Sequence, residues 1–192
     1  MLISLVGLSG SGKTYISKLL TSYNSKIIHL DIDKIGHDIY NNQTVVDNLI
    51  NSFGKKVIKE GRVNRKELAN IVFSSKEAMQ ILEEITWREM EKQIDTFIEN
   101  NPNKIIILDW LLLPKTKYFK KSDLRILITA PYKTRMKRAI NRDSITEEEF
   151  KKRDNAAPTL NEEDFNYIIN NNNLEKTQEE VRLIYDQSII HR

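Results

Sequence analysis

The stretch Gly7-Leu8-Ser9-Gly10-Ser11-Gly12-Lys13-Thr14 decides the fold of this chain. It fits the pattern G-x-x-x-x-G-K-[ST], whose glycines let the backbone form a nest of N–H groups that faces phosphate oxygens. An apolar run before it predicts a strand, and Ile16, Leu19 and Leu20 after it predict the buried face of a helix. The positive end of that helix adds attraction for phosphate. The stretch therefore predicts a phosphate-binding loop between a strand and a helix.

Two side chains of this loop have predicted roles toward a nucleoside triphosphate. Lys13 would reach the β- and γ-phosphates, and the Thr14 hydroxyl would coordinate Mg²⁺. The motif alone does not fix the reaction. A GTPase would carry N-K-x-D after a strand, but the one Asn-Lys pair, Asn103-Lys104, precedes its strand and lacks the aspartate. The sequence therefore favours a small phosphotransferase.

The composition bounds the class of protein. The 192 residues are 40% hydrophobic and 30% charged, which is typical of a soluble chain with room for one α/β domain and a smaller subdomain. No apolar run approaches the ~20 residues of a membrane span, and no signal peptide is predicted. The absence of cysteine excludes disulfides and thiolate chemistry, and a net charge of +3 is too small to indicate nucleic acid. We expect a cytoplasmic monomer or weak homo-oligomer that binds neither membrane nor nucleic acid.

Short apolar runs separated by helical stretches predict a five-stranded parallel sheet. In such a sheet the ligand binds beyond the carboxyl ends of the strands. Gly7, Asp31 and Asp109 each follow a run directly, so we expect them at one edge of the sheet. The predicted strands are Leu2–Val6, Lys26–Leu30, Ile105–Leu108, Leu124–Thr129 and Tyr167–Ile169.

Two helical segments interrupt this alternation. The first lies between the second and third strands and is far longer than one crossover helix requires. Its apolar spacing predicts helices over Val45–Phe53, Arg65–Phe73 and Lys76–Ile98. We therefore predict one kinase domain over 1–192, with a core (1–40, 101–132 and 160–192), a helical acceptor-binding insertion (41–100) and a helical lid (133–159).

Three carboxylates at the strand ends are candidates for the chemistry. In extended chain, Asp31 and Asp33 would point the same way, so that one could orient a Mg²⁺-bound water while the other accepts the proton of an attacking hydroxyl. The alternative is that one of them begins the helix carrying Ile35 and Ile39. Asp109 has the position of a metal-supporting carboxylate after a buried strand, or else of a polar strand terminus.

The predicted lid is rich in arginine. Arg135, Arg138 and Arg142 are separated by three and four residues, so their guanidinium groups share one helical face. Such a clamp can neutralise charge on a transferring phosphoryl group. Thr146-Glu147-Glu148-Glu149 reads as a capping box that starts a second helix. We expect a helical hairpin that closes over nucleotide, the alternative being a solvated charged helix.

The other polar features of the core receive structural interpretations. His29 lies within a predicted strand and is interpreted as packed and not catalytic. Asn170–Asn173 is interpreted as a turn, and Glu175–Ile189 as a terminal helix.

With these features placed, the chain resembles the dephospho-coenzyme A kinase family over nearly its whole length. The resemblance rests on motifs in the family's order and spacing. These are the phosphate loop, Asp31-Ile32-Asp33-Lys34-Ile35, Phe53-Gly54, Gly61-Arg62-Val63-Asn64-Arg65-Lys66-Glu67-Leu68 with Val72-Phe73, Leu111-Leu112-Leu113, Arg138-Ala139-Ile140-Asn141-Arg142-Asp143, and Asp164 to Asn170.

The resemblance implies a three-layer P-loop NTPase fold with ATP and Mg²⁺ as cofactors. It also implies ATP-dependent phosphorylation of the ribose 3′-hydroxyl of dephospho-CoA. Together with the residue analysis it gives four expected sets. They are catalytic Lys13, Asp33 (the general base) and Arg142; nucleotide-binding Gly10, Ser11, Gly12, Lys13, Thr14, Tyr15, Arg138 and Arg142; substrate-binding Asp33, Arg65 and Leu112; and metal-binding Thr14 and Asp109.

Departures from the family pattern gather on the acceptor side. Trp87-Arg88 stands where His-Pro is usual, Leu111 replaces a proline and Lys115 a glutamate. In the lid, Arg135 and Ala157 stand where glutamine is common. The alternatives are therefore a nucleoside or nucleoside-monophosphate kinase and a non-catalytic ATP-binding regulatory protein. A nucleic-acid binder ranks last, because the lid arginines lack interleaved aromatic residues.

Overall fold

The computed structural model describes residues 1–190, which divide into two compact units. The first joins Met1–Asp31 to the chain from Asn103 onward, and the second is Ile32–Pro102. The helical insertion was expected over 41–100, whereas the second unit begins at Ile32, directly after the second strand. Within the described residues no helix is long and apolar enough to cross a membrane.

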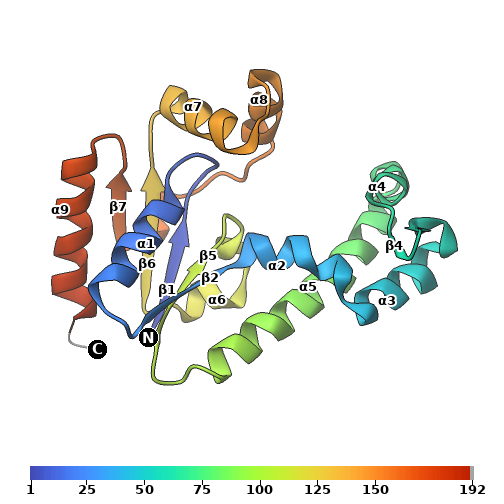
Figure 1. Ribbon diagram of the computed structural model, residues 1–192, viewed down its shortest axis with the longest axis horizontal. Helices are drawn as coiled ribbons and strands as arrows, with labels where there is room; N and C mark the ends of the chain where they lie inside the picture. The colour runs from blue at the N-terminus through green and yellow to red at the C-terminus, as the bar shows by residue number, and fades with distance from the viewer. Residues whose placement is uncertain (191–192) are drawn as a thin grey trace. The chain divides into compact units, whose positions relative to one another are not determined.

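The first unit is built on the predicted five-stranded parallel sheet (Figure 1). The strand order is β2-β5-β1-β6-β7, and every neighbouring pair is parallel. The strands have almost continuous apolar sequence because helices cover both faces. Their bounds are β1 Leu2–Val6, β2 Ile27–Asp31, β5 Ile105–Asp109, β6 Leu124–Thr129 and β7 Tyr167–Asn170.

Helices on the two faces of the sheet make three layers. On one face lie α1 (Lys13–Tyr23) and α9 (Leu174–Ile184), the latter continued by a π-helical turn, Tyr185–Ile189. On the other face α6 (Lys117–Lys121) packs against β1. The α/β fold with a parallel sheet is therefore confirmed. The core under α1 and α9 consists of Ile3, Leu5, Ile16, Leu20, Ile27, Ile105, Ile107, Leu124, Ile126, Ile128, Ile169, Val181, Ile184, Tyr185 and Ile189.

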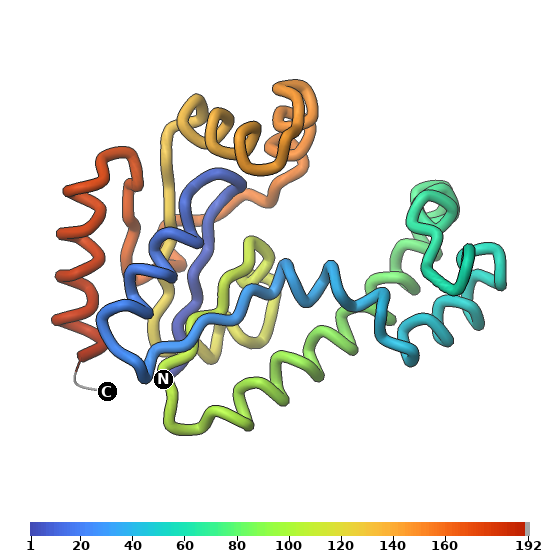
Figure 2. Tube along the Cα trace, in the orientation of Figure 1, coloured from blue at the N-terminus to red at the C-terminus, as the bar shows by residue number. Residues whose placement is uncertain are grey.

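The predicted lid is a helical hairpin in this same unit. It consists of α7 (Tyr132–Asp143) and α8 (Glu147–Asn155). Figure 2 shows this hairpin close to the loop after β1. The predicted capping box is present: the Thr146 hydroxyl accepts from the Glu149 backbone, and the Glu149 carboxylate accepts from the Thr146 backbone N–H. The Thr146 N–H and hydroxyl hold the pKa of Glu149 below its ordinary value. The start of α8 is therefore determined by residues of its own first turn.

The second unit is helical, with side-chain caps at three helix starts. Asn42, Asn64 and Ser75 accept hydrogen bonds from backbone N–H groups at the starts of α3, α4 and α5. The long helix α5 contacts α2, α3 and α4. The bounds are α2 Ile32–Asp38, a 3₁₀ turn Ile39–Asn41, α3 Gln43–Phe53, a 3₁₀ turn Lys55–Val57, β3 Ile58–Lys59, β4 Arg62–Val63, α4 Arg65–Ser74 and α5 Lys76–Glu99.

Two local features differ from the sequence interpretation. The antiparallel pair β3–β4 was not predicted, because two-residue strands are too short to show a period of two. Its signal was Glu60-Gly61, whose φ angles of 52° and 75° suit a tight hairpin turn.

The second difference concerns Asp33. Helix α2 begins at Ile32, so Asp33 lies in the first helical turn, where the helix dipole favours an acid. The extended-chain geometry expected for Asp31 and Asp33 is therefore wrong.

Candidate nucleotide-binding site

Two glycines of the loop between β1 and α1 have a backbone conformation that other residues rarely adopt. Gly10 and Gly12 have φ angles of 77° and 99°. A Cβ on Gly10 would lie 2.2 Å from the carbonyl oxygen of Arg135, and one on Gly12 would lie 1.9 Å from Nδ2 of Asn171. Helix α1 then begins at Lys13 without a side-chain cap. Its N-terminal N–H groups are therefore available to an anion, as the motif predicts.

Lys13 and Asp109 are brought together at the carboxyl edge of the sheet. The Lys13 Nζ donates to the Gly7 carbonyl over 2.9 Å and lies 3.8 Å from Oδ1 of Asp109. The Asp109 side chain is only 6% exposed. Its other oxygen, Oδ2, lies 3.3 Å from Nε2 of His29. The interpretation of His29 as merely packed thus missed a polar contact with a candidate site residue.

The oxygen donors near the loop fit a magnesium ion. Thr14 is exposed in the first turn of α1, and Asp31 lies opposite Asp109 in the β2–β5 register. In the part of the chain that the structure describes, no three His, Cys, Asp or Glu side chains gather as a metal cage. Mg²⁺ is commonly held by one or two carboxylates together with substrate phosphates. The Thr14 hydroxyl and the Asp109 carboxylate are therefore suitable ligands for the protein to offer Mg²⁺.

Asn171, directly after β7, is hydrogen-bonded to the phosphate loop. Its side chain is buried, and Nδ2 donates to the Ser11 carbonyl over 2.8 Å. Its backbone N–H donates to the Thr129 carbonyl, and its Oδ1 accepts from the Thr177 hydroxyl. The sequence interpretation treated this asparagine as part of a turn. Its only sequence signal was its place directly after a strand at the ligand-binding edge.

Replacing Asn171 with aspartate is expected to raise the KM for ATP about 10- to 100-fold. The variant loses the donor to Ser11 and puts a buried carboxylate against a carbonyl oxygen, which costs roughly 1–3 kcal/mol. Steady-state kinetics with varied ATP measures this. Asn172→Asp is the matched control, because Oδ1 of Asn172 only accepts, from the Thr134 hydroxyl. Equal KM values in the two variants would contradict the role of Asn171.

Arg135 differs from its expected place in the lid. It is buried within the hairpin, where it makes two hydrogen bonds to the Asp154 carboxylate, one of 3.2 Å. It also donates to the Ser9 carbonyl and lies over the Tyr132 and Phe150 rings. Arg135 and Arg138 thus both reach the phosphate loop from α7, but the Arg135 guanidinium is also held by Asp154. The Arg135–Asp154 pair joins α7 to α8, and the same guanidinium joins α7 to the phosphate loop.

Replacing Asp154 with asparagine is expected to destabilise the protein by about 3 kcal/mol. The reason is that it leaves the Arg135 charge buried with only carbonyl partners. Chemical denaturation measures the change in the free energy of unfolding. Glu148→Gln, which removes the exposed Glu148–Lys152 pair, should change it by less than about 1 kcal/mol. Similar values for both variants would show that the buried pair is not important.

The other two lid arginines, Arg138 and Arg142, have different partners. Arg138 is half-buried and donates to the Ser11 carbonyl, so it reaches the phosphate loop. Arg142 is exposed and bonds to Asp143, which also accepts from Arg153. These hydrogen bonds, Arg142 first, hold the pKa of Asp143 well below its ordinary value. Asp143 therefore stays ionised at neutral pH and orients Arg142.

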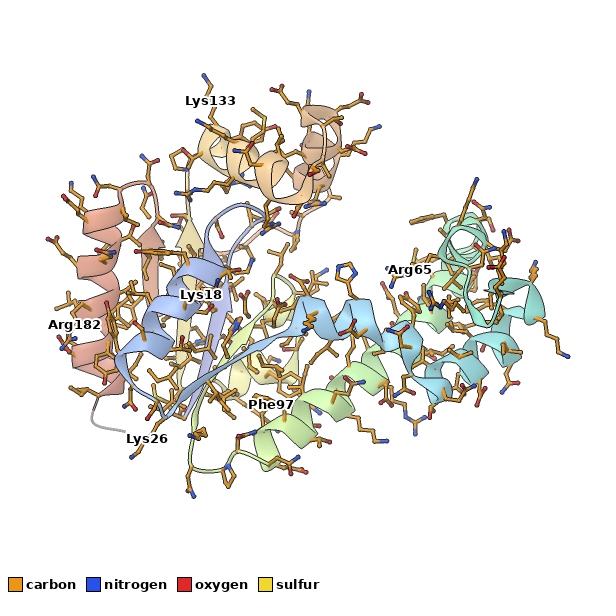
Figure 3. The ribbon with its side chains drawn as sticks, in the orientation of Figure 1. Lys18, Lys26, Arg65, Phe97, Lys133 and Arg182 are labelled. Atoms are coloured by element: carbon orange, nitrogen blue, oxygen red, sulfur yellow. The ribbon has the colours of Figure 1, made fainter. Side chains whose placement is uncertain are left out.

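One residue of the predicted nucleotide set, Tyr15, makes hydrogen bonds within the protein. The Tyr15 hydroxyl accepts from Gln178 of α9, and its backbone N–H donates to the Gly12 carbonyl. Tyr15 thus packs between α1 and α9. Lys133, at the start of α7, points away from the rest of its unit in Figure 3.

Comparisons with known proteins agree with this geometry. The family described as dephospho-CoA kinase matches residues 1–176. The chain belongs to the dephospho-CoA kinase family. A dephospho-CoA kinase of Aquifex aeolicus is 32% identical over 191 residues, covering 96% of each chain. One of Fusobacterium nucleatum is 34% identical over 149 residues, covering 77% of this chain and 76% of the relative.

Solved structures agree with the fold. A Thermus thermophilus protein has a TM-score of 0.81 at 23% identity, with 98% of this chain and 97% of that chain covered. A dephospho-CoA kinase from Campylobacter jejuni has a TM-score of 0.69 at 24% identity, covering 99% and 98%. Together with the family match, these likenesses confirm the predicted P-loop kinase fold.

The residues expected on the acceptor side of this family member fall in both units. In the helical unit, Arg65 donates to the His37 carbonyl over 2.9 Å and lies 5.1 Å from the Tyr40 ring centre (Figure 3). Burial raises the pKa of Tyr40, and Arg65 opposes this. Asp33 is exposed at the start of α2. Leu112, in the sheet unit, is half-buried at the start of a 3₁₀ turn, Leu113–Lys115.

Proposed function

We propose that this chain transfers the γ-phosphate of ATP to the 3′-hydroxyl of dephospho-CoA, giving CoA and ADP. The observation that carries the proposal is the glycine-built loop with Lys13 at its mouth, in a chain whose family match covers residues 1–176. The loop supplies a site for a polyphosphate. The family match indicates that dephospho-CoA is the acceptor.

The nucleotide would be held mainly by backbone and positive charge. The N–H groups of Gly10, Gly12, Lys13 and Thr14 would face the phosphates, whereas that of Ser11 donates to the Leu8 carbonyl. Lys13 would exchange its contact with the Gly7 carbonyl for the β- and γ-phosphates. Arg138 and Arg142, on the hairpin beside the loop, neutralise charge on the transferring group. The expected role of Tyr15 reduces to packing α1 against α9, since its hydroxyl and N–H bond within the protein.

Phosphoryl transfer needs one proton acceptor. The 3′-oxygen of the acceptor forms a bond to the γ-phosphorus while the bond from that phosphorus to the bridging oxygen breaks, and ADP leaves. The proton of the hydroxyl passes to a carboxylate, and we assign this role to Asp33. Asp33 is two residues from Asp31 along the chain and exposed, so it can meet an acceptor oxygen. General-base catalysis of this kind contributes about 10²- to 10⁴-fold.

Two side chains are assigned to the magnesium ion. The Thr14 hydroxyl and the Asp109 carboxylate would hold it, with Asp31 adjacent to Asp109 in the register. When bound, Mg²⁺ neutralises the phosphates and orients them. Asp109 also keeps Lys13 at the mouth of the loop, with 3.8 Å between its Oδ1 and the ammonium group.

Two residues that the sequence analysis predicted are proposed to contact the acceptor. Arg65 and Leu112 are the proposed contacts. The Arg65 guanidinium is fixed by the His37 carbonyl and the Tyr40 ring, which prepares it to meet an anionic group. A cytoplasmic location, a monomeric or weakly associated state, and the absence of membrane and nucleic-acid partners stay predictions.

The test is ADP release with Mg²⁺ and ATP, comparing dephospho-CoA with AMP, CMP, dTMP, adenosine and no acceptor. We expect stimulation by dephospho-CoA alone, with CoA as the product. Trp87-Arg88 would then be a tolerated variation on the acceptor side. Stimulation by a nucleotide or nucleoside would retain the mechanism and overturn the acceptor. Tight ATP binding without stimulation by any acceptor would favour a regulatory protein.

A further inference from the structure

His29 is a polar residue in an otherwise apolar row of the sheet. In the β2–β5 register His29 lies opposite Ile107, and Asp31 lies opposite Asp109. Side chains two residues apart in a strand point to the same face, so His29 and Asp109 share the face that α1 covers. Ile27, before it on this face, belongs to the apolar core. Packing alone would favour another apolar residue at position 29.

The two oxygens of Asp109 meet different groups. Oδ2 lies 3.3 Å from Nε2 of His29, and Oδ1 lies 3.8 Å from the Lys13 ammonium. The Asp109 side chain is 6% exposed and that of His29 24% exposed. A carboxylate so deeply buried needs partners for both oxygens. With its hydrogen on Nε2, the imidazole can donate to Oδ2 and fix the rotation of the carboxylate.

We propose that His29 is a positioning residue for Asp109: its Nε2–H holds Oδ2, so that Oδ1 is turned toward Lys13 of the phosphate loop, where the carboxylate would help to hold a metal ion. The proposal rests on the proposed function, in which Asp109 supports Mg²⁺. Groups that orient a metal ligand through a hydrogen bond commonly alter metal affinity 10- to 100-fold. His29 would therefore influence metal affinity through its hydrogen bond to Asp109.

The test is a manganese titration that needs no acceptor and no turnover. Mn²⁺ is added to protein saturated with the non-hydrolysable analogue in which an imido group bridges the β- and γ-phosphates, and free Mn²⁺ is measured by electron paramagnetic resonance. His29→Leu, which lacks a donor, is expected to weaken Mn²⁺ binding about 10-fold. His29→Gln, whose amide nitrogen can occupy the place of Nε2, should stay within about 3-fold of the unaltered protein.

Further arms separate positioning from a merely structural role. In turnover assays, His29→Leu should raise the Mg²⁺ concentration for half-maximal rate while kcat at saturating Mg²⁺ and the KM of the acceptor change little. Unaltered Mn²⁺ affinity in His29→Leu, or equal weakening in His29→Leu and His29→Gln, would overturn the proposal. If His29→Leu does not fold, His29→Met, which also lacks a donor, takes its place.

Asp109→Asn distinguishes this proposal from the proposed function. It should weaken Mn²⁺ binding at least as much as His29→Leu does. Normal Mn²⁺ affinity in Asp109→Asn would remove the metal role of Asp109 and overturn the proposal with it. Failure of dephospho-CoA to accept phosphate would leave the titration unaffected, because no acceptor is present.

Discussion

Replacement of Lys13 with alanine is expected to lower kcat/KM for ATP by about 10³-fold. The ammonium group is held at the mouth of the loop by the Gly7 carbonyl and Asp109, so it is already in place when the triphosphate binds. Positive charge aimed at a transferring phosphoryl group acts most strongly in the transition state, and losing one such group costs about 10²- to 10³-fold or more. We expect kcat to fall more than ATP affinity, because backbone N–H groups still bind the phosphates.

Steady-state turnover and calorimetric ATP binding measure the two effects separately. Lys18→Ala is the matched control, since Lys18 is an exposed lysine on the same helix (Figure 3) and should leave both values unchanged. A thermal melt of the Lys13→Ala variant checks that the protein still folds when the Asp109 carboxylate has lost the Lys13 ammonium group. Retention of more than a tenth of kcat in Lys13→Ala would contradict the assigned role.

The sequence was sufficient for the sheet and the loop because both depend on local patterns. Continuous apolar runs such as Ile105–Leu108 can be buried only in a covered strand, and all five predicted strands are found to within about a residue at each end. The glycines of the loop are similarly informative. Gly10 and Gly12 adopt positive φ angles that other residues rarely tolerate.

The features that sequence reasoning missed depend on residues far apart in the chain. Asn171 and Ser11 are 160 positions apart, and His29 and Asp109 are 80 apart. No local pattern pairs a polar side chain with such a partner. Arg135 shows the same limit, because helical spacing predicts its face of the helix but not the half-buried Asp154 that α8 places against it. Helix periodicity therefore predicts which residues share a surface, and packing decides whether that surface is exposed.

The second large effect is expected at Asp33. Replacing it with asparagine should reduce kcat about 10²- to 10⁴-fold while the KM for ATP changes less than about 3-fold. The amide cannot take the proton of the 3′-hydroxyl, and the proposed base acts only during transfer. Asp33 is exposed in the first turn of α2, two residues after Asp31, so an acceptor hydroxyl can reach its carboxylate.

Two controls make the Asp33 result decisive. Asp38→Asn, an exposed change at the other end of the same helix, should leave kcat unaltered. Asp31→Asn tests the neighbouring carboxylate, which lies opposite Asp109, the carboxylate assigned to the metal ion. If Asp31 supports the metal, its loss should be offset by higher Mg²⁺, whereas the Asp33 loss should not. A kcat near normal in Asp33→Asn, with a large decrease in Asp31→Asn at all Mg²⁺ concentrations, would transfer the role of base to Asp31.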